Sequence, residues 1–155
     1  TQSIRSLGVK LKLSSTRTIV KNKKVILIDD SLVRGTTCHK IVKMLYESGA
    51  KEVHVRIACP EIKYPDFYGV DMPTKEELLA HEKSNEEMCE YIKAKSLKFL
   101  SLGGLYNALI KEKRNLNYPQ FSDHYFTGES PIKPHDNLNG LKIRQLSLLS
   151  AKSNS

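Results

Sequence analysis

The stretch VILIDDSLVRGTT (residues 25–37) contains the transition that predicts the fold of this 155-residue chain. Residues 25–28 are apolar and partly β-branched, and with Asp29 they are typical of a buried parallel strand that ends in an acid. From Thr36 the apolar spacing becomes helical, and Gly49 is placed to end that helix. Residues 52–58 then alternate apolar and polar side chains, as a second strand does. The pattern predicts a strand–helix–strand unit with parallel strands.

Two capping-box signatures follow, Thr74 with Glu77 and Ser84 with Glu87. Residues 97–100 are expected to form a third strand, and the chain is expected to be loop-like from about residue 114. In the helix after Ser84, the side chains expected to face the protein interior are those of Met88, Tyr91 and Ile92. A last helix is expected to be capped by Ser101. One face of this helix would carry Leu102, Leu105 and Leu109. The fold class is therefore α/β, a parallel sheet with flanking helices, with fewer strands than such sheets usually have.

The positive charge is concentrated at the start of the chain. The net charge is +8, and residues 1–24 hold seven of the 25 Lys and Arg residues and none of the 17 acids. Three interpretations remain for this basic arm: a solvated terminus, a nucleic-acid contact, or a loop that closes over an anionic small molecule. The arm has no aromatic side chain for base stacking, so we expect no nucleic-acid partner.

Composition indicates neither a membrane protein nor a zinc protein. Mean hydropathy is −0.41, and no apolar run approaches the roughly 20 residues of a membrane helix. The three cysteines are widely separated, without a Cys-x-x-Cys pair. Free thiols in a reducing compartment are expected, so the predicted location is cytoplasmic.

The end of the first strand carries the candidate site. Asp29 and Asp30 lie where open α/β sheets bind ligands. Gly35 permits a tight turn, and Thr36 and Thr37 open the next helix, where backbone N–H groups attract anions. A sugar phosphate with Mg²⁺ fits two carboxylates beside an anion cradle. Neither the P-loop pattern nor the dinucleotide glycine pattern is present.

The same stretch resembles the phosphoribosyl-pyrophosphate (PRPP) loop of type I phosphoribosyltransferases. With LGVKLKLSSTR (residues 7–17) and CPEIKYPDFYGVDMPTKEELLAH (residues 59–81), the resemblance narrows to the glutamine PRPP amidotransferases, or amidophosphoribosyltransferases. It covers roughly residues 1–130. It implies a partial type I phosphoribosyltransferase fold without the N-terminal half of that domain and without the glutaminase domain. Residues 1–24 would belong to a substrate-closing loop, residues 25–112 to the core, and residues 113–155 to a loop-rich tail.

The resemblance also implies roles for single residues. Asp29 and Asp30 would be catalytic, contacting the ribose and Mg²⁺. The 5-phosphate would be held by Arg34, Gly35, Thr36 and Thr37. The loop would be shaped by Ser31, Leu32 and Val33. The substrate's phosphates would be approached by the arm residues Arg5, Lys10 and Lys12. The implied reaction transfers ammonia, taken from glutamine, to PRPP and yields 5-phosphoribosylamine and pyrophosphate, the first step of de novo purine synthesis.

The family's cofactors and partners are implied in the same way. Mg²⁺ is expected, and purine nucleotides are possible inhibitors. A homo-oligomer or a separately supplied N-terminal half is expected as partner. Some members bind an iron–sulfur cluster through cysteines, but Asp66, Ser122 and Tyr125 occupy those positions here, so no cluster is expected. No partner is identifiable for His124 in the loop nearby.

Other interpretations remain open. A non-catalytic PRPP-binding regulator would need a DNA-binding domain, and no winged-helix pattern is visible. A phosphoacceptor receiver domain would need an acid at the end of a later strand, where Ala58, Cys59 and Pro60 stand instead. An inactive gene fragment is the fourth interpretation. In an incomplete sheet, an unpaired edge and an exposed apolar face are expected, with marginal stability or aggregation.

Overall fold

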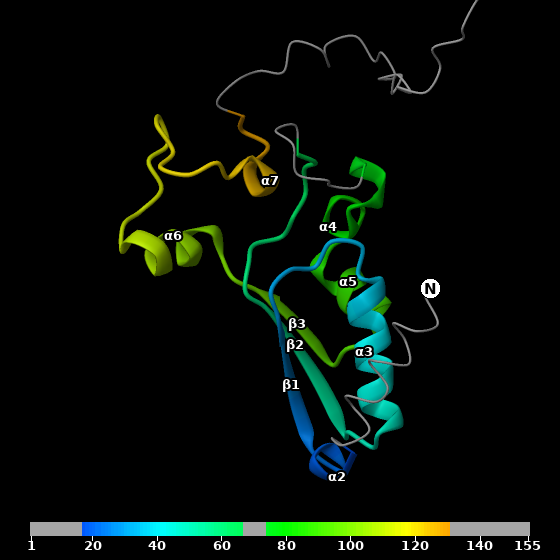
Figure 1. Cartoon of the computed structure of the whole chain (residues 1–155). Helices are drawn as coiled ribbons and strands as arrows, with labels where there is room; N and C mark the ends of the chain where they lie inside the picture. The colour runs from blue at the N-terminus through cyan, green and yellow to red at the C-terminus, as the bar shows by residue number, and fades with distance from the viewer. Residues whose placement is uncertain (1–16, 67–73, 131–155) are drawn as a thin grey trace, which may run out of the picture.

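The computed structural model describes residues 17–66 and 74–130. In chain order (Figure 1) its elements are α2 (Arg17–Val20), β1 (Lys24–Asp29), α3 (Thr36–Glu47), β2 (Glu52–Ile57), η1 (Lys75–Glu77), α4 (Leu79–Glu82), α5 (Asn85–Tyr91), β3 (Ser96–Phe99), α6 (Leu102–Ile110) and α7 (His124–Thr127). The expected strand–helix–strand unit and the third strand are confirmed. Across the described residues, no helix has both the length and the apolar character to span a membrane.

The sheet is parallel throughout. Among the described residues it has three strands in the order β1-β2-β3. The register places Val25 opposite Val53 and Val55 opposite Leu97. The carboxyl ends of the strands therefore meet at one edge of the sheet, where α/β proteins bind their ligands.

One face of the sheet carries the core. Helix α3 lies along this face, and Figure 1 shows α5 on the same side. Val53 and Val55 of β2 are fully buried against Val42 of α3 and Ile92 after α5 in one cluster. Both helices begin as their sequences predict, since α3 starts at Thr36 and Ser84 caps α5 in a complete capping box with Glu87.

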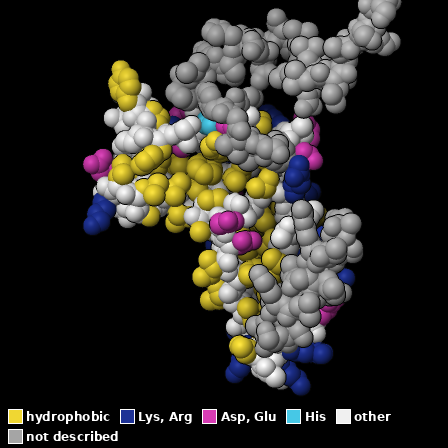
Figure 2. Space-filling model, in the orientation of Figure 1, with side chains coloured by type: hydrophobic (Ala, Val, Ile, Leu, Met, Phe, Trp, Pro, Cys, Tyr) yellow, Lys and Arg dark blue, Asp and Glu magenta, His cyan; other side chains and the backbone are white. Residues whose placement is uncertain are grey.

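The opposite face of the sheet is open along β1. Ile26 and Ile28 are 64% and 73% exposed, and they alternate with the half-buried side chains that face α3. Figure 2 shows a group of hydrophobic side chains along the edge of β1 and a larger one over α6. Parallel sheets are normally covered on both faces. The exposed apolar face expected from the sequence is therefore confirmed for β1.

Helix α6 begins as the sequence predicts. Ser101 caps it, accepting a hydrogen bond from the Gly104 N–H at 3.0 Å. Its apolar face is only partly buried, because Leu109 is 58% exposed and the buried residue of this helix is Tyr106. Figure 1 shows the reason, since α6 extends beside the sheet rather than across it.

A buried ionic cluster fixes the segment after α6. Arg114 donates to Asp123 through Nε at 2.5 Å and Nη2 at 3.2 Å, and to Glu129 at 2.6 Å. The hydroxyl of Tyr106 donates to the same Asp123 at 2.8 Å. The short helix α7 follows within a stretch that was expected to be loop throughout. This cluster, together with an edge contact between the rings of Tyr106 and Phe121, joins α6 to residues 114–129.

We expect acid to release this segment at the pKa of Asp123. Burial raises the pKa of Asp123, but hydrogen bonds from Arg114 and Tyr106 outweigh it, so the pKa lies below its ordinary value of 3.8. A lowered carboxyl pKa contributes stability above the unfolded-state value, and that stability is lost as pH falls through the folded-state value. Near-ultraviolet circular dichroism between pH 7 and 2 should show the loss. The variant Asp123→Asn should lack this acid step, and an unchanged step would contradict the assignment.

We also expect the double substitution Ile26→Lys/Ile28→Lys to reduce aggregation of the chain. Both side chains are exposed on an edge strand, so charge there should hinder strand pairing and leave the free energy of unfolding within about 0.5 kcal/mol. Light scattering against protein concentration measures the effect. Ile19→Lys, at an exposed site on α2, is the control and should change little.

Candidate functional site

The two adjacent carboxylates lie at the carboxyl end of β1. Asp29 is the last residue of the strand and half-buried, and Asp30 is exposed. The Asp30 N–H donates to Asp29 Oδ1 at 3.1 Å, and the Ser31 hydroxyl donates to Asp30 Oδ1 at 3.2 Å. These bonds occupy one oxygen of each carboxylate, so each keeps capacity to accept from a ligand.

The strand-end loop, residues 29–37, is anchored at its middle. Leu32 is only 2% exposed and belongs to the core cluster with Cys38 and Val42. The sequence interpretation gave Leu32 a part in shaping the loop, and its burial provides a physical basis for this. Its side chain holds the backbone in place and is not available for contact with a ligand.

The loop ends in an uncapped helix. Gly35, at φ 73°, is the N-cap of α3 and brings no side chain, and the first turn has no acid. The first intrahelical bond joins the His39 N–H to the Gly35 carbonyl at 2.9 Å. The N–H groups of the preceding turn, at Thr36 and Thr37, therefore have no capping side chain and lie at the positive end of the helix dipole. This is a suitable place for an anion.

Gly35 is enclosed by two side chains from distant segments. A Cβ atom there would lie 2.7 Å from Leu79 Cδ2 and 3.0 Å from Tyr91 Cε1. The expectation that Tyr91 points into the core is wrong, because it is 38% exposed. It lies against the loop instead, and its carbonyl accepts a hydrogen bond from His39 Nδ1 at 2.8 Å.

Arg34 is held by an acid that the sequence interpretation assigned only to capping. Its Nε and Nη2 atoms lie 3.3 Å and 3.1 Å from the two carboxylate oxygens of Glu77. The hydrogen bond from Arg34 is the main cause that lowers the pKa of Glu77. Sequence reasoning missed this pair because 43 residues separate its members and only folding brings them together.

The thiols near the loop are not nucleophiles. Burial, with a smaller effect from Asp29, raises the pKa of Cys38 to about 11. Burial also raises the pKa of Cys59, followed by the charge of Asp30. Both thiols therefore stay protonated at neutral pH, and the three cysteines are free, as expected.

The carboxylates fit Mg²⁺ by their chemistry. Mg²⁺ is usually bound by one or two carboxylates together with water and substrate phosphates. Asp29 and Asp30 supply such oxygens. Among the residues that the structure describes, no group of three or more His, Cys, Asp or Glu side chains could hold a metal by itself. The donor set thus suits a cation that arrives with a phosphate ligand.

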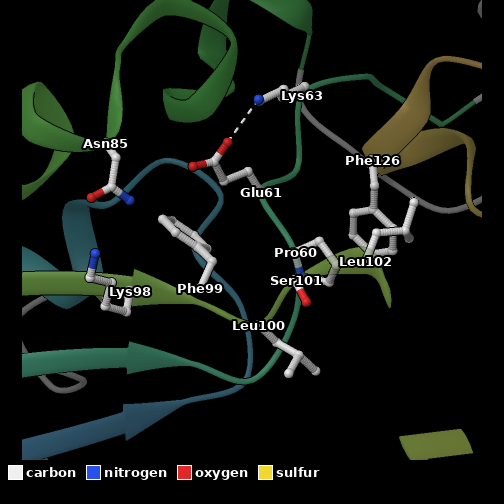
Figure 3. Close-up of a pocket in the computed structure, with 10 residues that line it drawn as sticks. All are labelled: Pro60, Glu61, Lys63, Asn85, Lys98, Phe99, Leu100, Ser101, Leu102 and Phe126. Carbon is white, nitrogen blue, oxygen red and sulfur yellow. Dashed lines mark ion pairs between the residues drawn. The ribbon is translucent and has the colours of Figure 1, made fainter. Parts of the chain in front are cut away.

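A separate hollow of about 360 Å³ lies at the carboxyl ends of β2 and β3 (Figure 3). Its walls include Asn85, Lys98 and Phe99, and an ion pair of 2.8 Å between Lys63 and Glu61. None of its lining residues belongs to the strand-end loop. The loop is therefore a surface site next to this hollow and does not form part of it.

A buried polar cluster includes His124. The His124 Nε2 atom lies 3.0 Å from Asp66 Oδ1, which accepts the hydrogen bond, and its Nδ1 atom lies 3.0 Å from the Ser122 hydroxyl. The sequence identified no partner for His124, and folding supplies one, because it brings Asp66 to His124 across 58 residues. The cluster unites Asp66 and Ser122, two of the positions discussed above for the iron–sulfur cluster. The absence of an iron–sulfur cluster stays a prediction.

The basic arm residues Arg5, Lys10 and Lys12 lie outside the described residues. So do residues 67–73, between Asp66 and Thr74. Their predicted roles remain predictions.

Comparisons with known proteins identify relatives along nearly the whole chain. No family model matches. An amidophosphoribosyltransferase of Rhizobium etli is 51% identical over 152 residues, 97% of this chain and 31% of that protein. Amidophosphoribosyltransferase 1, chloroplastic, of Arabidopsis thaliana is 49% identical over 86% of this chain and 23% of its own length. A Staphylococcus aureus amidophosphoribosyltransferase is 47% identical over 88% of this chain and 27% of its own length.

Solved structures agree with these relatives. The glutamine PRPP amidotransferase of Bacillus subtilis, complexed with ADP and GMP, matches with a TM-score of 0.68 and 45% identity, over 74% of this chain and 25% of that chain. A structure described as the allosteric regulatory enzyme of purine biosynthesis matches with a TM-score of 0.70 and 43% identity. The match covers 78% of this chain and 26% of that chain. The expected fold, part of a type I phosphoribosyltransferase domain, is confirmed. The chain spans between about a quarter and a third of the relatives it matches.

We predict that Gly35→Ala destabilises the chain by about 1–3 kcal/mol, because alanine is strained at positive φ and its methyl group would meet Leu79 and Tyr91. Urea unfolding followed by circular dichroism measures the change. Gly103→Ala is the matched control, since nothing lies within 4 Å of its Cβ position on α6. The control should be neutral or stabilising by up to about 1 kcal/mol. Equal effects of the two substitutions would disprove the role of Gly35.

Proposed function

We propose that this chain, a homologue of part of the amidophosphoribosyltransferases, supplies the PRPP-binding loop of an enzyme that makes 5-phosphoribosylamine. The observation that carries the proposal is the pairing of two carboxylates with an uncapped helix N-terminus in one loop, residues 29–37. Relatives 47–51% identical over most of the chain carry the same enzyme name. The substrates would be PRPP and ammonia released from glutamine, and the products 5-phosphoribosylamine and pyrophosphate.

The carboxylates would act at the ribose. Ammonia attacks C1, its nitrogen forms the new bond, and the bond from C1 to pyrophosphate breaks with the electrons leaving on pyrophosphate. Transfer at this carbon develops positive charge, as in other glycosyl transfers. Asp29 and Asp30, at the end of β1, are placed to stabilise that charge and to bind ribose hydroxyls. The same two residues would hold Mg²⁺, which when bound neutralises the pyrophosphate.

The backbone that opens α3 would hold the 5-phosphate. Gly35, Thr36 and Thr37 lie at its N-terminus, where no acid and no capping side chain compete for the N–H groups. The two threonine hydroxyls are in exposed residues and add donors. Lys10 and Lys12 of the basic arm would approach the pyrophosphate and exclude water when the arm closes.

The remaining features of the proposal concern partners and location. We propose purine nucleotides as regulators, because the Bacillus subtilis relative was solved with ADP and GMP. A glutaminase activity would have to come from sequence that this chain does not cover. A homo-oligomer and a cytoplasmic location are proposed as well, and the free cysteines agree with a reducing compartment.

The test is calorimetric binding of PRPP to the chain with and without Mg²⁺. We expect saturable, Mg²⁺-dependent binding that weakens roughly 10- to 100-fold in Asp29→Asn/Asp30→Asn, since two charged hydrogen-bond acceptors are lost. Glu47→Gln/Glu112→Gln removes two exposed carboxylates elsewhere and is the matched control. Absence of binding to a chain that is folded by circular dichroism would refute the proposal. Binding without turnover, after both the glutaminase part and the rest of the transferase domain are supplied, would favour the non-catalytic PRPP-binding regulator.

A further inference from the structure

We infer that Glu77 is a positioning residue for the strand-end loop, acting through Arg34, and that Arg34 does not itself hold the substrate's phosphate. The inference rests on the proposed function for its consequence in PRPP binding. Its structural part, that the pair fixes the loop, stands on contacts within the described residues.

The geometry of the pair is a fork. Two nitrogens of the Arg34 guanidinium face the two oxygens of the Glu77 carboxylate, at 3.3 Å and 3.1 Å. The Glu77 carboxylate is itself fixed, because its Oε2 accepts from the Thr74 N–H at 3.3 Å in the capping box of η1. Paired donors and acceptors of this kind give orientation as well as attraction. Arg34 is thus oriented by a capped turn, while both side chains of the pair stay about half exposed.

Further contacts join the same two segments. The Leu79 N–H donates to the Val33 carbonyl at 2.9 Å, one residue before Arg34. The next residue, Gly35, lies against Leu79 and Tyr91. Leu78 and Leu79 are buried, so the turn that carries Glu77 is anchored in the protein interior. Three consecutive residues of the loop, 33 to 35, are therefore clamped from one side by residues 77–91.

The pair also leaves Arg34 poorly placed for a phosphate. Its Nε and Nη2 atoms form the edge that binds oxyanions in pairs, and Glu77 occupies it. The opposite charge of Glu77 also reduces the attraction that Arg34 would exert on an anion. The arrangement favours a phosphate that is bound by the N–H groups at the start of α3. Arg34 then fixes the conformation of the loop that precedes these groups.

The test compares Glu77→Gln, Arg34→Gln and the double variant. Glutamine at 77 still accepts the capping-box hydrogen bond, so that substitution removes the ion pair and keeps the cap of η1. The first readout needs no ligand. Hydrogen exchange at the Leu79 N–H should accelerate by about tenfold in each variant, as expected when a local clamp loosens. The Lys95 N–H, bonded to Val53 at the sheet, is the internal control and should not change.

The second readout is the affinity for PRPP with Mg²⁺. Positioning predicts that both single variants weaken binding by a similar factor, about three- to tenfold, and that the double variant is no weaker than either. If Arg34 held the phosphate and Glu77 competed for it, Arg34→Gln would weaken binding far more, and Glu77→Gln would leave it unchanged or tighten it. That pattern would overturn the inference. Glu47→Gln, which breaks the exposed pair of Lys43 and Glu47 on α3, is the matched control and should change neither readout.

The two readouts separate the inference from the proposed function. A wild-type chain that does not bind PRPP refutes the proposed function, and exchange at Leu79 still decides whether Glu77 positions the loop. If hydrogen exchange at the Leu79 N–H is unchanged in Glu77→Gln, the inference is refuted, whether or not the variant binds PRPP.

Discussion

The structure depends on a single tight connection, the left-handed turn at Gly35 between the end of β1 and the start of α3. The turn leaves the helix without a capping side chain and brings its N-terminus next to the two carboxylates of the strand. Any side chain at this position would meet Leu79 and Tyr91, so the same glycine also fixes how closely the later segment can approach. Loop conformation, anion cradle and clamp therefore share one backbone constraint.

The strand-end loop is supported by a sheet that is covered on one face and open on the other along β1. Helices α3 and α5 bury one face, and β2 contributes fully buried valines to that core. The other face leaves Ile26 and Ile28 exposed along an edge strand. In amidophosphoribosyltransferases the matched region is about a quarter to a third of the chain. The exposed isoleucines lie on β1, the strand that ends in the strand-end loop.

Sequence patterns predicted the structure correctly where a feature depends on a single helix or strand. The strands, the start of α3 at Thr36 and the capping boxes at Thr74 and Ser84 were all predicted. Features that depend on a distant neighbour were predicted wrongly or not at all. Tyr91 lies against the loop because Gly35 leaves space for it, Leu109 is exposed because α6 does not cross the sheet, and His124 is buried because Asp66 reaches it. No periodicity within a helix or loop contains that information.

The sequence by itself determined the fold class, the position of the two carboxylates at a strand end and the uncapped helix after them. Those features depend on hydrophobic periodicity and on glycine, which act over a few residues. Only the tertiary structure decided that Arg34 is paired with Glu77, that residues 77–91 clamp the loop, and that Asp66 meets His124. These contacts join residues 43 to 58 positions apart. The contacts of the loop form because burial of Leu78 and Leu79 anchors residues 77–91 beside it, so the partner of Arg34 is set by packing and not by its local sequence.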